Sequence, residues 1–433
     1  MQKIAFFIGF LLISVPLFCQ ECGDKAHSSK ELLDRRKALL NMLDTGSAVL
    51  IKSADATPDN MIEPFRQSPD FMYLTGIDEP GYKIIMYPKG YRFGNRLKSV
   101  IIFTYPEQLY EPVFLSAGDT LLDDKFFEPV LASITRDLRT LYYSPVPELT
   151  NDWLNEKVVI REREVKKTFE QAHPGLKLKP ANKLFSLMRQ IKTDDEIAQT
   201  RKAIGFTGDG IRSVMQKIRP GMYEYEVQAI IEYEAKSEGA SSMAFPSIIG
   251  SGTNSLMPHY EKNSCRMKKD DIVVMDVGAR YESYCADITR TIPVSGSFTP
   301  GQKVIYQAVL DIQKEVIAMI KSGITFSDLD RRTTQLTAAA GYKNYIIHSV
   351  THSLGLVVHD PSAGDTLRPG MIITIEPGIY IPSDDTVQAS DRRGFGVRIE
   401  DDVLVTADGF EVLSKNIPKE IAEIEKLMNN KRK

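Results

Sequence analysis

The fold of this chain is decided by the stretch "VVMDVGARYESYCADITRT", residues 273–291, in which two aspartates interrupt a β-rich and largely apolar sequence. A tight hairpin in this stretch would turn at Tyr281 and Glu282. That turn would place Asp276 directly opposite Asp287, because the two aspartates are equally far from it. Directly opposed side chains lie only about 5 Å apart, so two like charges there destabilise a sheet. The pair therefore requires a nearby positive charge.

Acidic residues interrupt apolar sequence again further along the chain. Glu376 interrupts the apolar strand "MIITIE", and Glu400 interrupts "GVRIE". Arg398 would share a strand face with Glu400 at a spacing of two, and Arg290 follows the aspartate pair. Two arginines leave a charge deficit against four carboxylates, whereas two divalent cations would balance all four. The sequence therefore predicts a metal site.

The histidines are concentrated in the same region. The stretch "HSVTHSLGLVVHD", residues 348–360, holds three of the six histidines of the chain, and His259 stands in "LMPHYEKN". One imidazole added to four carboxylates favours Mn²⁺, with Fe²⁺, Co²⁺ or Zn²⁺ as alternatives, whereas a closed structural zinc site would use thiolates. A single aspartate or histidine of this kind is more often structural, but the whole set indicates a metal site because unpaired buried charge is costly.

Composition restricts the class of protein. The chain has 433 residues, 42% hydrophobic and 26% charged, which predicts a soluble protein of two domains. The formal net charge of −3 excludes the basic surface that nucleic-acid binding requires.

The N-terminus has the pattern of a secretory signal. One lysine precedes an apolar run of about fifteen residues, which fits a secretory signal better than a membrane span, so we expect residues 1–19 to be a cleaved signal peptide. The mature protein would be exported, periplasmic or extracellular, without stable membrane insertion. The alternatives are a lipid anchor at Cys19 and an uncleaved anchor. Cys22, Cys265 and Cys285 match neither a zinc ribbon nor a disulfide framework, and Cys285 is expected to be a small buried filler.

Two domains follow from the order of the predicted elements. Residues 29–178 alternate helical sequence with the β-rich runs "AVLIK", "FMYLTG", "YKIIMYP" and "SVIIFTY", which predicts an α/β domain. Residues 194–415 form the second domain, in which two helices followed by strands occur twice and indicate a duplicated unit. Its helices are predicted to begin or end at Thr193 and Glu196 (a capping box), Tyr223, Gly239, Thr299, Pro300, Gly323 and Gly341.

The second domain resembles the metallopeptidases of the pita-bread fold, the family of methionine aminopeptidase, prolidase and aminopeptidase P. The resemblance implies an α/β two-domain protein with an α/β creatinase-like N-terminal domain and an α+β pita-bread catalytic domain made of duplicated ααββ units. "FRQSPDFMYLTGIDEPG" resembles the N-terminal domain of aminopeptidase P, and "AFPSIIGSGTNSLMPHY" resembles the strand before its substrate-binding histidine. The ligands of the family's two metal ions correspond here to Asp276, Asp287, His352, Glu376 and Glu400.

The resemblance also implies an activity. The expected enzyme is an Xaa-Pro aminopeptidase, which releases the N-terminal residue from peptides with proline in the second position through attack of a hydroxide that bridges two metal ions. Glu376 would also carry the proton to the leaving nitrogen. His348 and His359 would contact substrate or stabilise charge on the carbonyl oxygen, or alternatively only orient ligands. The remaining residues around the proline and the proton path would be His259, Tyr380 and Arg398.

Two other functions remain open from the sequence. A prolidase would cleave only Xaa-Pro dipeptides, and a non-catalytic peptide-binding protein would use the same fold without hydrolysis. The resemblance further implies a homo-oligomer, either a dimer or a tetramer.

Overall fold

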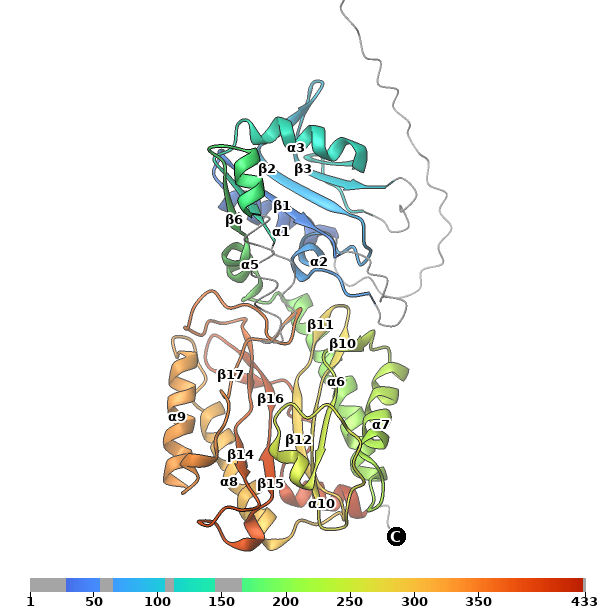
Figure 1. Cartoon of the computed structure of the whole chain (residues 1–433), viewed down its shortest axis with the longest axis vertical. Coiled ribbons are helices and arrows are strands. Elements are labelled where there is room, and N and C mark those ends of the chain that lie inside the picture. Colours follow the sequence, from blue (N-terminus) through green and yellow to red (C-terminus); the bar gives the residue numbers. More distant parts are fainter. Residues whose placement is uncertain (1–28, 55–64, 106–112, 145–165, 431–433) are drawn as a thin grey trace, which may run out of the picture.

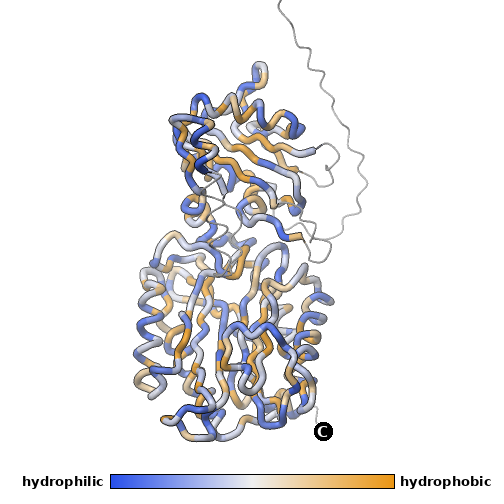
Figure 2. Tube along the Cα trace, viewed as in Figure 1, coloured by the Kyte–Doolittle hydropathy of each residue, from blue (hydrophilic) through white to orange (hydrophobic). Residues whose placement is uncertain are grey.

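The computed structural model describes residues 29–54, 65–105, 113–144 and 166–430, which form two domains along the long axis of the molecule (Figure 1). The predicted signal peptide, residues 1–19, lies outside the described residues. In Figure 2 apolar segments follow the strands of both domains, as expected for sheets packed against helices.

The N-terminal domain is built on one six-stranded sheet in the order β4-β3-β2-β1-β5-β6. Its central strand β1 pairs with β2 in the antiparallel and with β5 in the parallel direction. Alternate residues of β1 enter two different apolar cores, one containing Val49 and the other Ala48, so both faces of the sheet are buried. The elements are α1 (Ser29–Met42), β1 (Ser47–Lys52), α2 (Pro69–Thr75), β2 (Lys83–Phe93), β3 (Arg96–Thr104), β4 (Asp119–Asp123), η3 (Asp124–Phe126), α3 (Phe127–Thr135), β5 (Thr140–Tyr143), β6 (Lys177–Pro180) and α5 (Asn182–Arg189).

One predicted element of this domain is wrong. The run "FMYLTG" was expected to be β-rich, but it belongs to the helix α2, Pro69–Thr75. Pro69 stands in the first turn, and Gly76 closes the helix in the left-handed conformation with φ 66°. Asp70 and the residues after it in α2 are all buried, so the helix has no polar face and its periodicity is hidden.

The C-terminal domain repeats an order of two helices followed by strands. The predicted capping box is confirmed, because Thr193 Oγ1 accepts from Glu196 N and the Glu196 side chain accepts from Thr193 N. The first unit contains α6 (Asp194–Lys217), α7 (Glu224–Ser237), β7 (Ser242–Met243), β8 (Ile248–Ser251), η4 (Gly252–Leu256), β9 (Ile272–Val277), β10 (Ala279–Tyr281), β11 (Tyr284–Cys285) and β12 (Ile288–Pro293).

The second unit begins at the predicted cap, Thr299, with Pro300 in the first turn of α8. This helix ends at Ile317 and not near Gly323, because the chain tightens into i→i−3 hydrogen bonds that turn Ile320 into the core. The unit contains α8 (Pro300–Ile317), α9 (Phe326–Ala339), η5 (Lys343–Tyr345), β13 (Ile372–Ile375), β14 (Gly378–Ile381), η6 (Ser390–Arg392), β15 (Phe395–Arg398), β16 (Asp401–Val405), β17 (Phe410–Val412) and α10 (Ile421–Asn429).

The two units meet along their strands, with the helix pairs α6–α7 and α8–α9 on opposite outer sides (Figure 1). Glu400 N donates to Thr289 O at 3.0 Å, which joins the second unit to β12 of the first. One apolar core contains residues of both units. The acidic residues singled out in the sequence therefore approach one another from two halves of the domain.

Candidate metal centre and active site

The hairpin of residues 272–293 turns one position later than expected. Tyr281 pairs with Tyr284 around a two-residue turn, in which Glu282 and Ser283 have φ of 47° and 74°. Asp276 therefore lies opposite Thr289, and the predicted direct pairing with Asp287 is wrong. A shift of the turn by one position moves the partner by two residues, so Asp287 stays on the same face, diagonal to Asp276.

The two glutamates stand just outside their strands and not within them. Glu376 follows β13, and Glu400 lies between β15 and β16. Their backbone N–H groups bond to other segments, Glu376 N to Val350 O at 2.9 Å and Glu400 N to Thr289 O at 3.0 Å. The regular pairing of β13 and β15 ends before these glutamates because their N–H groups bond to Val350 and Thr289 instead. This change of backbone direction points both glutamate side chains toward the aspartates.

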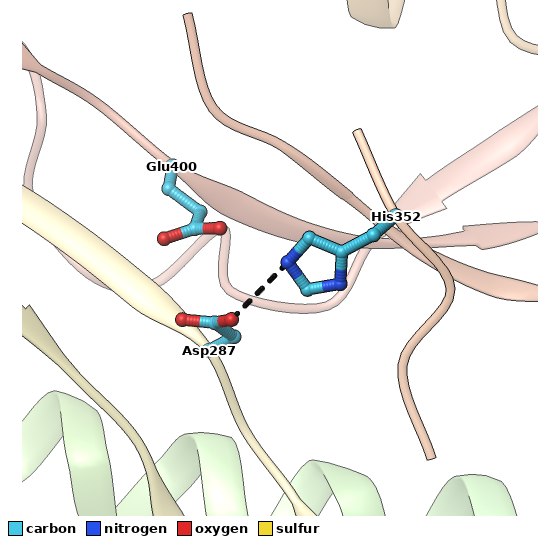
Figure 3. Close-up of side chains that lie close together, drawn as sticks. All are labelled: Asp287, His352 and Glu400. Carbon is cyan, nitrogen blue, oxygen red and sulfur yellow. Dashed lines mark ion pairs between the residues drawn. The ribbon is translucent and has the colours of Figure 1, made fainter. Parts of the chain in front are cut away.

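Three of the predicted ligands converge on one space (Figure 3). One ligand atom each from Asp287, His352 and Glu400 lies within 4.8 Å of the other two. His352 Nε2 is 3.4 Å from Asp287 Oδ2 and 3.6 Å from Glu376 Oε1. The side chain of Asp287 is 7% exposed, and Glu400 as a residue is 1% exposed, so these carboxylates are shielded from water.

Only one of the two arginines expected beside the four carboxylates neutralises negative charge there. Arg398 was expected beside Glu400, but its Nη2 bonds to Asp276 Oδ2 at 2.7 Å. Arg290 turns to the opposite face of β12, because side chains alternate along a strand, and it pairs with Asp401 at 2.8 Å. Only Arg398 therefore faces the four carboxylates among the described arginines.

Because one arginine does not balance four carboxylates, the carboxylates repel one another, and the pKa values of several of them are raised. Burial, followed by the charge of Asp276, raises the pKa of Asp287 well above its usual range. Burial and then the charge of Asp287 do the same for the pKa of Glu400. Burial raises the pKa of Glu376 to about 8, against the opposing effects of His352 and Arg398.

The donor set fits divalent metal ions. Asp276 Oδ1 is buried and has no hydrogen-bond partner in the described part of the chain. An orphaned carboxylate oxygen beside three further carboxylates and an imidazole is the environment that hard or borderline divalent cations occupy. Cys285 is buried with its Sγ 3.6 Å from Leu356 O, consistent with a packing role for this residue.

A hydrogen-bonded chain leads away from Asp276. Arg398 Nη1 donates to Tyr380 Oη at 2.8 Å, and Tyr380 Oη lies 2.8 Å from His348 Nε2. His348 Nδ1 lies 2.7 Å from Ser349 O, which assigns the ring proton to Nδ1 and makes Nε2 the acceptor from Tyr380. Burial, followed by the charge of Arg398, lowers the pKa of His348 to about 4, so this imidazole is neutral at pH 7.

The other two predicted histidines lie at the edge of the cluster. The ring of His359 stands edge-on to that of His352, with centroids 4.4 Å apart. His259 lies in the turn after η4, is exposed, and is near enough to His348 to lower the pKa of that ring further. Each predicted site residue is thus near the four carboxylates, although their roles stay predictions.

Two supporting residues were not predicted from the sequence. Thr289 Oγ1 accepts from Arg398 Nε at 3.2 Å and donates to Glu400 Oε2 at 2.7 Å. Asp402 Oδ2 accepts from Asp287 N at 3.1 Å. Nothing in the sequence distinguishes Thr289 from other strand threonines. Asp402, in contrast, follows Asp401 within an apolar strand, and two adjacent acidic residues there could have indicated a supporting role.

A third unpredicted residue anchors the segment that carries His259. The Glu224 side chain is buried and accepts five hydrogen bonds, all from residues 251–265. One of the donors is Tyr260 Oη at 3.0 Å, directly beside His259 in the sequence. Glu224 was overlooked because an acid in the first turn of a helix is ordinary.

We expect the metal-free protein to lose stability as the pH rises. The carboxyl of Glu376 has a pKa of about 8 in the folded protein against 4.5 when unperturbed, so between these values the folded state holds a proton that the unfolded state has released. The free energy of unfolding should therefore fall by on the order of a few kcal/mol from pH 5 to pH 8. Thermal unfolding in the presence of a chelator, followed at several pH values between 5 and 8, measures this decrease. A Glu376→Gln variant, which lacks this group, should show a smaller decrease, and equal slopes in both proteins would contradict the assignment.

Comparison with known proteins identifies the relatives of the chain. Residues 198–407 match the model of metallopeptidase family M24, and residues 33–111 match that of the aminopeptidase P N-terminal domain. The Xaa-Pro aminopeptidase of Escherichia coli (strain K12) is 31% identical over 452 residues, which cover 94% of this chain and 99% of that protein. The structure of aminopeptidase P from E. coli with the inhibitor Pro-Leu is similar with a TM-score of 0.79 at 28% identity, covering 94% of this chain and 99% of that one. The Xaa-Pro dipeptidase of Pyrococcus horikoshii is 37% identical over 313 residues, 65% of this chain and 85% of that protein.

Fold and site together define a two-domain metallopeptidase with a pita-bread catalytic domain, which confirms the expected fold class. The chain belongs to metallopeptidase family M24, in the branch of the Xaa-Pro aminopeptidases that carry the aminopeptidase P N-terminal domain. Each described helix is too short or too polar to cross a membrane.

Proposed function

We propose that this protein releases the N-terminal residue from peptides with proline in the second position, with the help of two divalent metal ions. The observation that carries the proposal is the set of four carboxylates around His352, faced by Arg398 alone among the described arginines. Relatives of nearly full-length similarity are named Xaa-Pro aminopeptidases. The predominance of oxygen donors favours Mn²⁺, with Co²⁺, Fe²⁺ or Zn²⁺ as alternatives.

The residues that would hold the ions are Asp276, Asp287, His352, Glu376 and Glu400. When bound, two such ions supply an activated water molecule and polarise the scissile carbonyl. One of these residues, Glu376, would also transfer the proton. The carboxyl of Glu376 would accept a proton from that water and release it to the leaving nitrogen.

The leaving group explains why a proton carrier is needed. A proline in the second position makes the scissile amide tertiary, so its nitrogen has no hydrogen and must be protonated before it departs. Glu376 Oε2 lies 3.6 Å from His348 Nδ1 and Glu376 Oε1 lies 3.6 Å from His352 Nε2, which fixes its carboxyl between two imidazoles. Burial and the charge of Arg398 keep His348 neutral, so this ring adds no charge that would repel a metal ion, and Tyr380 Oη orients it at 2.8 Å.

Substrate length separates the proposed enzyme from a prolidase. We expect a tripeptide of the form Xaa-Pro-Xaa to be hydrolysed at least about as fast as the dipeptide Xaa-Pro, because an aminopeptidase must accept chain beyond the proline. The two rates are compared by measuring release of the free N-terminal residue from each peptide by Mn²⁺-loaded protein. Turnover of the dipeptide alone would establish a prolidase, and metal binding without turnover of either peptide would establish a binding protein.

Export and self-association belong to the same proposal. Residues 1–19 would direct the protein out of the cytoplasm, to the periplasm or the extracellular space, and the mature chain would form a dimer or tetramer. N-terminal sequencing of the mature protein tests the first statement, and the molar mass in solution tests the second. A mature chain that begins at Met1, or a monomer at micromolar concentration, would contradict them.

A further inference from the structure

A second group of buried charges lies outside the metal centre and connects the two domains. Arg189, the last residue of α5, bonds to Asp70 of α2 at 2.8 Å through Nη1. Its Nη2 bonds to Asp360 Oδ1 at 2.5 Å, and Lys192 Nζ lies 3.2 Å from Asp360 Oδ2. Two cations and two anions thus alternate between the N-terminal domain and the segment that follows His359.

Burial makes these contacts specific. The side chains of Asp360 and Lys192 are each 1% exposed, and that of Arg189 is 6% exposed. Water cannot replace either partner of a pair at such positions, so Asp360 keeps its place only while both cations remain. Arg189 in turn requires Asp70, whose Oδ2 also accepts from Ser144 Oγ at 2.9 Å.

Asp360 determines the path of the chain around the neighbouring histidines. Its backbone N–H donates to Ser353 O at 2.9 Å, which closes a loop from His352 to His359. At Gly355 an added Cβ would lie 2.5 Å from Asp360 Oδ2, so the loop is wrapped against this carboxylate. The loop places the ring of His359 edge-on against the ring of His352.

We propose that Asp360 is a positioning residue for the reaction: held by Arg189 and Lys192, it fixes His359 at the active site, and Asp70 extends this support into the N-terminal domain. The inference rests on the proposed function and assigns the N-terminal domain a part in catalysis. Asp360 acts only through His359, because its own carboxylate is fully engaged with the two cations.

The test is a double-mutant cycle. Asp360→Asn keeps the size of the side chain and removes its charge, and it should lower kcat/KM for an Xaa-Pro-Xaa tripeptide by roughly ten- to a hundredfold with unchanged metal content. The decrease in kcat/KM should arise from kcat and from KM in the same proportions as the decrease caused by His359→Ala. In the His359→Ala background, the same substitution should change kcat/KM by less than about threefold.

A matched control separates positioning from stability. Asp119 is a buried partner of Arg36 within the N-terminal domain, at 3.3 Å, and neither residue contacts the loop from His352 to His359. Asp119→Asn should lower the melting temperature as Asp360→Asn does, while its kcat/KM stays that of the unchanged protein. A merely structural role for Asp360 would make the two variants alike in kcat/KM.

The outcomes are distinguishable from failure of the proposed function. If the unchanged protein hydrolyses no Xaa-Pro peptide, the proposed function is wrong. If it is active, additive effects of Asp360→Asn and His359→Ala, or an Asp360→Asn variant with unchanged kcat/KM, overturn the positioning role. Should Asp360→Asn not fold, Asp70→Asn decides: we expect a several-fold loss of kcat/KM with the same division between kcat and KM. Unchanged kcat/KM in Asp70→Asn would then refute the inference.

Discussion

Replacing Glu376 with glutamine should lower kcat for an Xaa-Pro-Xaa peptide by roughly two to four orders of magnitude. Glutamine keeps the shape of the side chain but can neither accept a proton nor donate one as an acid. The carboxyl of Glu376 lies 3.6 Å from a ring nitrogen of His348 and of His352, where it would carry the proton from the activated water to the leaving nitrogen. Its loss should therefore affect the chemical step more than substrate binding.

The Glu376→Gln experiment requires kcat, KM and metal content from the same preparation. Glu411→Gln serves as the control, because Glu411 is a half-exposed carboxylate that pairs with Arg201 on the surface of the same domain. We expect the control to retain full activity. A Glu376→Gln variant that binds the full complement of metal and loses less than about tenfold in kcat would show that another group carries the proton.

Replacing Glu400 with glutamine should abolish most activity and weaken the retention of metal. Burial, followed by the charges of Asp287 and Glu376, raises the pKa of Glu400 well above its usual range, so the carboxylate is costly unless cations lie beside it. The amide removes one of the four proposed anionic ligands, and it also removes part of the repulsion among the four carboxylates. We therefore expect opposite effects on stability in the two states of the site: the variant should melt at a higher temperature than the unchanged protein in a chelator, and at a lower one with saturating Mn²⁺.

Two melting curves for each protein test this reversal, with metal content measured after gel filtration. The metal-free Glu400→Gln variant should gain at least about 2 °C over the metal-free unchanged protein. Thr289→Val is the companion variant, because Thr289 Oγ1 donates to Glu400 at 2.7 Å without being a ligand, and it should weaken metal retention less. Unchanged activity and metal content in Glu400→Gln would count against the site as described.

Much of the site could be predicted from charge alone. An aspartate at position 276 in an apolar strand, a second one a short hairpin away, and two later glutamates in apolar sequence required compensation whatever the exact fold. The histidine-rich stretch supplied the nitrogen donor. The family resemblance then assigned the roles of Tyr380 and Arg398, which the residues themselves did not reveal.

Register and partner choice could not be predicted, for identifiable reasons. The hairpin turns at Glu282 and Ser283, and both residues adopt positive φ without the Asn-Gly or Asp-Gly signal of such turns, so the centre was placed one position early. Arg398 reaches Asp276 from another unit, a contact that depends on how the two halves approach. Asp360 ends the histidine-rich stretch, but its partners Arg189 and Lys192 lie far away in the sequence, and only the folded chain reveals them.

We propose that the four carboxylates and His352 hold two divalent ions, and a calorimetric titration of metal-free protein with Mn²⁺ at pH 7 tests this proposal most directly. We expect two equivalents to bind, with release of protons, because the pKa of Glu376 is raised to about 8 and those of Asp287 and Glu400 are raised as well. The second equivalent should be lost or much weakened in Glu400→Gln. Binding of no Mn²⁺, or of the same two equivalents with the same affinities in Glu400→Gln, would contradict the account.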